Sequence, residues 1–144
     1  MFILLTGIIQ MMPVSAQMPS RGASAASTSV DTVDGERVVH TAMKYLGVRY
    51  RIGANGPKYF DCSGFTRFVF GQKNVPLTRC SRTQFNEGVP VEKVADLKPG
   101  DLVFFSGTRI SQTVGHVGIV KELNADSSDV SFVHASRTDR KSVV

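Results

Sequence analysis

The chain has 144 residues, of which 42% are hydrophobic and 20% charged, as is ordinary for one packed globular domain. This composition excludes a wholly disordered chain, a collagen-like chain and a protein with several membrane spans, and two cysteines are too few for a disulfide-rich miniprotein. The net charge of +5 favours an anionic polymer as partner, but the scattered basic residues and the lack of a recognition motif argue against nucleic acid.

The N-terminal segment is predicted to be an export signal. Residues 2–12 form an apolar run that is too short to span a bilayer, which requires about 20 apolar residues. Small residues at positions 14–16 follow, as at a signal-peptidase site. We therefore expect residues 1–16 to be a signal peptide cleaved after Ala16, with export to the periplasm or extracellular cell envelope and no stable membrane insertion afterwards. A buried N-terminal helix is the alternative.

Residues 17–35 are rich in Ser, Ala and Thr, which is typical of a flexible tether.

Helices are predicted in the first half of a domain that spans residues 36–144. Apolar residues recur at helical spacing over residues 36–46, and a second helix is expected to open within residues 61–64, followed by an apolar stripe. A short third helix is expected over residues 81–87, because its first and fourth residues, Ser and Gln, have the spacing of a capping box.

Strands are predicted to follow the helices. A short strand is expected over residues 49–52, and β-rich runs separated by turn residues occupy residues 101–106, 116–123 and 130–134. The last two runs are joined by turn chemistry at residues 124–127. This order predicts an α+β fold, with N-terminal helices packed on one face of a small antiparallel sheet.

Cys62 is a candidate nucleophile because of its predicted place at a helix start. Asp61 and Ser63 are both good N-cap residues, which puts Cys62 at or next to a helix N-terminus. Backbone N–H groups and the helix dipole favour negative charge there, and such placement can lower a thiol pKa from about 8.5 into the range of about 3.5–7.5. The sequence therefore predicts a thiolate, which still needs a base and donors for an oxyanion.

Two histidines on predicted strands are candidates for that base. If the two strands pair antiparallel through the turn at residues 124–127, His116 and His134 come close together. One imidazole could then hydrogen-bond the other while it faces the thiol across the helix–sheet interface. His40 lies in the first predicted helix, has no such neighbour, and is expected at the surface.

Simpler interpretations of these residues remain open at this point. A lone cysteine is often a small buried hydrophobe, and an exported protein with two cysteines can bridge them, here Cys62 to Cys80. Zinc bound by Cys62, Cys80, His116 and His134 is a further possibility, although no C-x₂-C or H-x₃-H spacing supports it.

Five segments, taken in order, strongly resemble the NlpC-type cysteine peptidases of bacterial cell walls. They are Tyr50, the DCSGF segment at residues 61–65, LKPGDLVFF at 97–105, GHVGIV at 115–120 and FVHAS at 132–136. The resemblance covers residues 36–136. It implies a papain-like α+β core in which the nucleophile, at a helix N-terminus, faces an antiparallel sheet.

The resemblance also implies roles for individual residues. Cys62 corresponds to the nucleophile, His116 to the general base and His134 to the polar residue that orients the base. Tyr50 corresponds to a tyrosine whose hydroxyl helps to hold the oxyanion. The positions expected to contact substrate are Asp61, Ser63, Arg79 and Ser81.

The activity that the resemblance implies is hydrolysis of peptidoglycan stem peptides through a thioester. The usual target is the bond between the γ-carboxyl of D-glutamate and a diamino acid, and no metal or cofactor is required. Alternatives are a thioester-forming acyltransferase or amidase on the same fold and a non-catalytic cell-wall-binding domain. We also expect the protein to be a monomer.

Relatives usually continue through a further strand after the position of His134, so we also expect the chain to be truncated at its C-terminus.

Overall fold

The computed structural model describes residues 3–6, 33–106, 113–126, 129–137 and 142–143. The predicted cleavage site after Ala16 and nearly all of the predicted tether lie outside these residues. No helix among the described residues combines the length and the apolar character needed to cross a bilayer.

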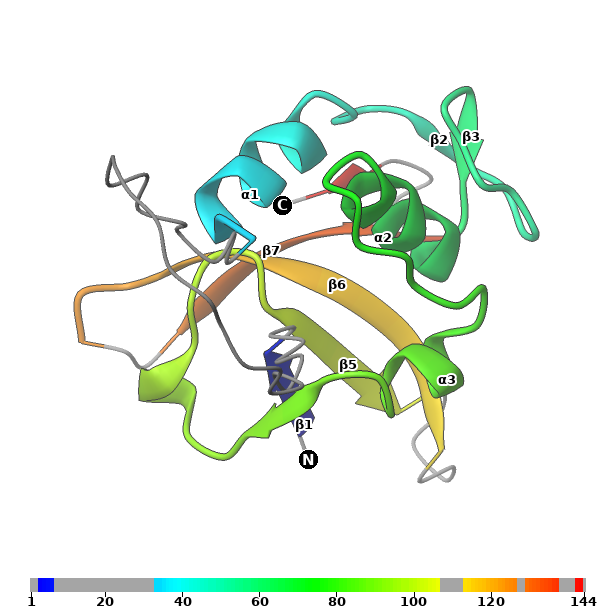
Figure 1. Cartoon of the computed structure of the whole chain (residues 1–144). Coiled ribbons are helices and arrows are strands. Elements are labelled where there is room, and N and C mark those ends of the chain that lie inside the picture. The colour runs from blue at the N-terminus through cyan, green and yellow to red at the C-terminus, as the bar shows by residue number, and fades with distance from the viewer. Residues whose placement is uncertain (1–2, 7–32, 107–112, 127–128, 138–141, 144) are drawn as a thin grey trace, which may run out of the picture.

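Three helices and a six-stranded antiparallel sheet make up the fold, as the α+β prediction requires (Figure 1). The helices are α1 (Gly35–Met43), α2 (Cys62–Gly71) and α3 (Ser81–Gln84), with a 3₁₀ turn at Val94–Asp96. In spatial order, the sheet contains β4 (Val89–Val91), β1 (Ile3–Thr6), β5 (Leu102–Ser106), β6 (Val114–Leu123), β7 (Val130–Ala135) and β8 (Ser142–Val143). A separate parallel pair consists of β2 (Arg49–Tyr50) and β3 (Tyr59–Phe60).

The second helix begins where the sequence predicts, because its N-cap holds it there. The Asp61 carboxylate accepts a hydrogen bond from the Gly64 N–H at 2.7 Å, which satisfies one of the donors that a helix start leaves open. A Cβ at Gly64 would lie 2.1 Å from the Ala54 carbonyl oxygen, so only glycine allows the loop to approach this turn so closely. The cap and this contact fix Cys62 as the first residue of α2.

The third helix departs from its prediction. It ends at Gln84, three residues before the expected end, and its N-cap is Cys80 rather than Ser81. Gln84 forms no capping box, because its amide is buried and bonded to Thr66, to the Ser63 carbonyl and to the Thr78 carbonyl. Three partners in a buried position outweigh one exposed cap bond, since an unsatisfied buried amide is costly.

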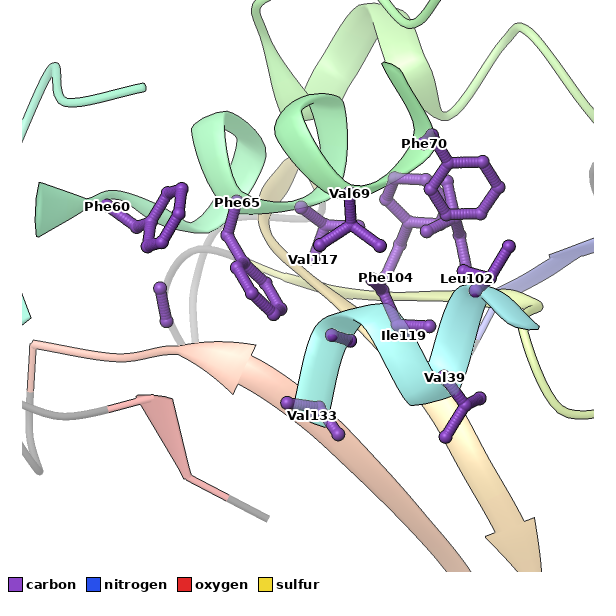
Figure 2. Close-up of a cluster of buried hydrophobic side chains, with 13 residues drawn as sticks. Val39, Phe60, Phe65, Val69, Phe70, Leu102, Phe104, Val117, Ile119 and Val133 are labelled. Carbon is purple, nitrogen blue, oxygen red and sulfur yellow. The ribbon is translucent and has the colours of Figure 1, made fainter. Parts of the chain in front are cut away.

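The hydrophobic core lies between the helices and one face of the sheet (Figure 2). Phe60, Phe65 and Val69 come from the helical side. They meet buried residues of the three central strands, which are Leu102, Phe104, Val117, Ile119, Val133 and Ala135. The core therefore joins α2, which begins at Cys62, to β6 and β7, which carry His116 and His134.

The sheet contains strands that the sequence did not predict. Ile3–Thr6 pairs antiparallel with both β4 and β5, so this part of the predicted signal peptide occupies an inner position of the sheet. The alternative of a buried N-terminal helix is therefore wrong for residues 3–6. The pairing depends on residues about 85 to 100 positions away in the sequence, and no local pattern reports such contacts.

Candidate active site

Cys62 lies at the N-terminal end of α2, half-buried and with a free thiol. Hydrogen bonds from the backbone N–H groups of Ser63 and Val117 reach the sulfur and favour its ionised form. The Val117 N–H belongs to the peptide bond that follows His116. The helix and the sheet therefore bring the predicted nucleophile beside the backbone of its predicted base.

The predicted lowering of the thiol pKa is wrong. Burial raises the pKa of Cys62 above its ordinary value, and the negative charge of Asp61 raises this pKa further. The backbone N–H groups oppose this rise but do not cancel it. Removal of water from the sulfur thus outweighs the helix terminus, and at neutral pH the resting group is a thiol.

Alkylation of the folded chain tests this protonation state. We expect iodoacetamide at pH 7 to modify the exposed Cys80 faster than Cys62, because burial keeps Cys62 protonated and partly shielded. Peptide mapping by mass spectrometry as a function of time measures both rates in one sample, and the unfolded chain serves as the control in which the rates converge. Faster modification of Cys62 in the folded chain would show an ionised resting thiol.

The predicted pairing of the two strand histidines is confirmed. His116 Nε2 lies 2.7 Å from His134 Nδ1, and the two rings are nearly perpendicular, at 76°. The registers Ile119 to Val133 and Val120 to Phe132 place Gly118 opposite His134. A Cβ at Gly118 would lie 2.8 Å from the Phe132 ring and 3.3 Å from the His134 Cβ, so glycine leaves room for these two side chains of β7.

His116 is neutral over most of the pH range. Burial and the neighbouring His134 lower its pKa to about 4. Because Nε2 is engaged with His134, the general-base role predicted for His116 requires Nδ1 to take the proton. That role requires Nε2 to carry the hydrogen and to donate it to His134 Nδ1, so His134 must be neutral with its own hydrogen on Nε2.

This tautomer requirement makes a prediction about His134. We expect His134→Ala to lower kcat/KM by about 10²-fold, since the imidazole of His116 loses its acceptor, whereas His134→Asn keeps an acceptor and loses about 10-fold or less. The wild-type rate should fall only as the pH drops toward about 4, where His116 gains a proton. Initial rates between pH 3.5 and 8 measure both effects. Equal losses in the two variants would contradict an orienting role.

Tyr50 packs against the same core cluster as Cys62. Burial raises the pKa of its hydroxyl, and the negative charges of Cys62, when ionised, and of Asp61 raise it further. The positive charges of Arg137 and Arg79 act in the opposite direction. The hydroxyl therefore stays protonated and can donate a hydrogen bond, as the role predicted for Tyr50 requires.

Three of the predicted substrate contacts are buried, and the side chains of Asp61, Ser63 and Arg79 are bonded within the protein. The Asp61 carboxylate accepts hydrogen bonds from the Gly53 N–H at 2.8 Å and from Arg79 Nη1 and Nη2 at 3.0 and 2.5 Å, besides the N-cap bond. Arg79 Nη1 also donates to Ser63 Oγ at 3.0 Å. Asp61, Ser63 and Ser81 are each at most 7% exposed, and Arg79 is partly exposed. These contacts hold the start of α2 in place, and substrate contact by the four residues stays a prediction.

Two of the alternatives left open by the sequence, a disulfide and a zinc site, find no support in the described residues. Cys62 and Cys80 are both free, so they form no disulfide here. Within the parts of the chain that the structure describes, no three His, Cys, Asp or Glu side chains are grouped as a metal site would need. His40 is exposed on α1, as predicted.

Two features of the site have no signal in side-chain patterns. The Val117 N–H reaches the sulfur through the backbone, and Arg137 acts on Tyr50 from beyond the end of β7. Both follow from how the strands pass the start of α2, and the positions of helix and sheet were needed to find them.

Comparison with known proteins agrees with this geometry. The model of the NlpC/P60 family matches residues 47–143. The chain is 39% identical over 102 residues to a probable endopeptidase p60 of Listeria seeligeri, covering 69% of this chain and 19% of that protein. It is 37% identical over 110 residues to a gamma-DL-glutamyl hydrolase of Bacillus subtilis, covering 74% of this chain and 24% of that protein. The crystal structure of the NlpC/p60 domain of the peptidoglycan hydrolase SagA superposes with a TM-score of 0.62 and 31% identity, covering 76% of this chain and 86% of that one.

Proposed function

Because the chain belongs to the NlpC/P60 family, we propose that it is a cysteine endopeptidase that hydrolyses peptide bonds in peptidoglycan stem peptides. The observation that carries the proposal is the combination of a thiol at the start of α2 with the His116–His134 pair on the adjacent strands. The chain spans about a fifth of the length of the p60 relative from Listeria seeligeri. The proposal therefore concerns the chemistry of this domain.

The reaction begins from a neutral thiol and a neutral imidazole. His116 Nδ1 takes the proton of Cys62 as the sulfur attacks the amide carbonyl, so the thiolate forms only as it is consumed. The resulting oxyanion accepts hydrogen bonds from the Cys62 N–H at the helix terminus and from the Tyr50 hydroxyl. His116 then protonates the leaving amine, a thioester remains on Cys62, and water activated by His116 releases the acyl group.

His134 stabilises the charged state of the base. When His116 becomes an imidazolium, its Nε2–H donates to the lone pair of His134 Nδ1, and this bond becomes charge-assisted. The low pKa of His116 makes it a weak proton acceptor but a strong acid toward the leaving amine. A base of this kind favours a reaction in which departure of the amine is the demanding step.

The bond we propose is the one between the γ-carboxyl of D-glutamate and the diamino acid that follows. The support is the name of the Bacillus subtilis relative, a gamma-DL-glutamyl hydrolase, together with the peptidoglycan hydrolase SagA among the solved structures. Export after cleavage behind Ala16 belongs to the same proposal. The N-terminal mass of the chain recovered from the culture medium or periplasm tests it.

Product analysis tests the proposed function. The purified chain is incubated with isolated peptidoglycan and with the tripeptide L-Ala-γ-D-Glu-L-Lys, and the products are identified by mass spectrometry, with Cys62→Ala as the control. We expect free L-Ala-D-Glu and lysine from the tripeptide. A product that carries an added amine in place of the new carboxylate would instead indicate an acyltransferase. If neither substrate gives any product, the result would favour the alternative of a non-catalytic cell-wall-binding domain.

A further inference from the structure

Three arginines lie in segments that follow α2 or β7, and two of them already have acceptors. Arg79 is held by the Asp61 carboxylate and Ser63. Arg82 Nε donates to the Val114 carbonyl at 3.3 Å. Arg137 is exposed and forms no ion pair with any residue in the described ranges. Among these three guanidinium groups, that of Arg137 is therefore the one best able to bind an anion from solution.

Arg137 lies two positions after the end of β7 and three positions after His134. β7 packs against α2, and Ala135 is buried in the core cluster to which Tyr50 and Cys62 also belong. In Figure 1 the end of β7 runs behind α2, with which β7 is in contact. Arg137 lies in the turn after this strand, close enough for its positive charge to act on the Tyr50 hydroxyl.

The proposed substrate carries an anion at a matching position. A glutamate linked through its γ-carboxyl keeps its α-carboxylate, which is separated from the scissile carbonyl by three carbon atoms, or about 5 Å in an extended chain. Tyr50 is proposed to bind the oxygen of that carbonyl. A cation within electrostatic reach of the Tyr50 hydroxyl is therefore near the place where the α-carboxylate must lie. Arginine suits this task because its planar guanidinium can bind both carboxylate oxygens.

From this geometry we propose that Arg137 binds the α-carboxylate of the γ-linked glutamate and so selects peptides in which this group is free rather than amidated. The inference rests on the proposed function and adds the chemical group that the site recognises. It also separates the two arginines by role, because Arg79 holds Asp61 and the start of α2, whereas Arg137 contacts the substrate.

The test compares two peptides that differ only in this group. They are L-Ala-γ-D-Glu-L-Lys and its α-amide, L-Ala-γ-D-isoglutaminyl-L-Lys. We expect Arg137→Gln to lower kcat/KM for the free acid by about 10- to 100-fold, as loss of a charge-assisted bond predicts, and to change that for the amide by less than about 2-fold. Arg37→Gln removes the same charge from an exposed position on α1 and should leave the selectivity unchanged. Equal losses for both peptides, or no loss for the free acid, would overturn the proposal.

A binding measurement separates this inference from the proposed function. Calorimetric titration of Cys62→Ala with each peptide needs no cleavage, and the double variant Cys62→Ala/Arg137→Gln should lose affinity only for the free acid. If the wild-type chain cuts neither peptide but Cys62→Ala still discriminates between them, the carboxylate site stands and the hydrolase proposal fails. If cleavage occurs but neither rate nor affinity responds to Arg137, or if Cys62→Ala binds neither peptide, the inference fails.

Discussion

Replacement of Cys62 by Ala will abolish cleavage of the γ-glutamyl tripeptide, with kcat/KM falling by about 10⁴-fold or more. Cys62→Ser should fall nearly as far, although its hydroxyl occupies almost the same place. The reason is the base, because an imidazole with a pKa of about 4 is too weak to deprotonate a hydroxyl group. Rates of peptide release, followed by chromatography, measure the loss.

The second cysteine supplies the matched control for this experiment. Cys80 is exposed, and its side chain makes no capping bond at the start of α3. Cys80→Ala should therefore keep its rate within about 2-fold of wild type and unfold at the same urea concentration. A Cys62→Ser chain that retained a substantial part of the activity would show that the sulfur is not essential, which contradicts the thioester route.

Loss of the Asp61 side chain will cost more stability than loss of any surface carboxylate. Asp61→Ala removes the cap of α2, leaves the Gly64 and Gly53 N–H groups without their acceptor and leaves Arg79 without its partner. We expect the free energy of unfolding to fall by roughly 2–4 kcal/mol, discounted for the partial exposure of Arg79. Urea denaturation measures this difference.

Asp34 provides a control with the same residue type in the same local role. It caps α1 through one exposed hydrogen bond from the Glu36 N–H at 3.1 Å, so Asp34→Ala should cost only about 0.5–1 kcal/mol. Asp61→Asn should in addition lower the pKa of the Cys62 thiol, since a negative charge that raises it disappears. A loss in Asp61→Ala no larger than in Asp34→Ala would mean that the buried network contributes little.

The parts of this fold that the sequence predicts are those decided by neighbouring residues. The start of α2 follows from a capping Asp beside an apolar stripe, and the hairpin formed by β6 and β7 follows from two β-rich runs with a turn between them. Because the hairpin fixes which residues face each other, the pairing of His116 with His134 also follows from the sequence. The fold class follows from the order of helices and strands, and the family from five local segments that resemble its members.

What the sequence did not predict depends on contacts between distant segments. The pKa of Cys62 is set by how much water the sheet removes from the helix terminus, and a local dipole argument gives the wrong direction. Gln84 turns inward because Thr66 and two carbonyl groups from other segments meet it there. The position of Ile3–Thr6 between β4 and β5 requires strands that come much later in the chain.

The two imidazoles belong to one hairpin, whereas the thiol belongs to a helix that only packs against it. The antiparallel pairing of β6 with β7 and the 2.7 Å contact between His116 Nε2 and His134 Nδ1 hold the two rings together. Small movements of α2 relative to the sheet therefore change the distance between the Cys62 sulfur and the His116 ring. They leave the distance between the two imidazole rings unchanged. A small truncation in the interface, such as Val69→Ala, should slow turnover while its acidic midpoint stays where it is.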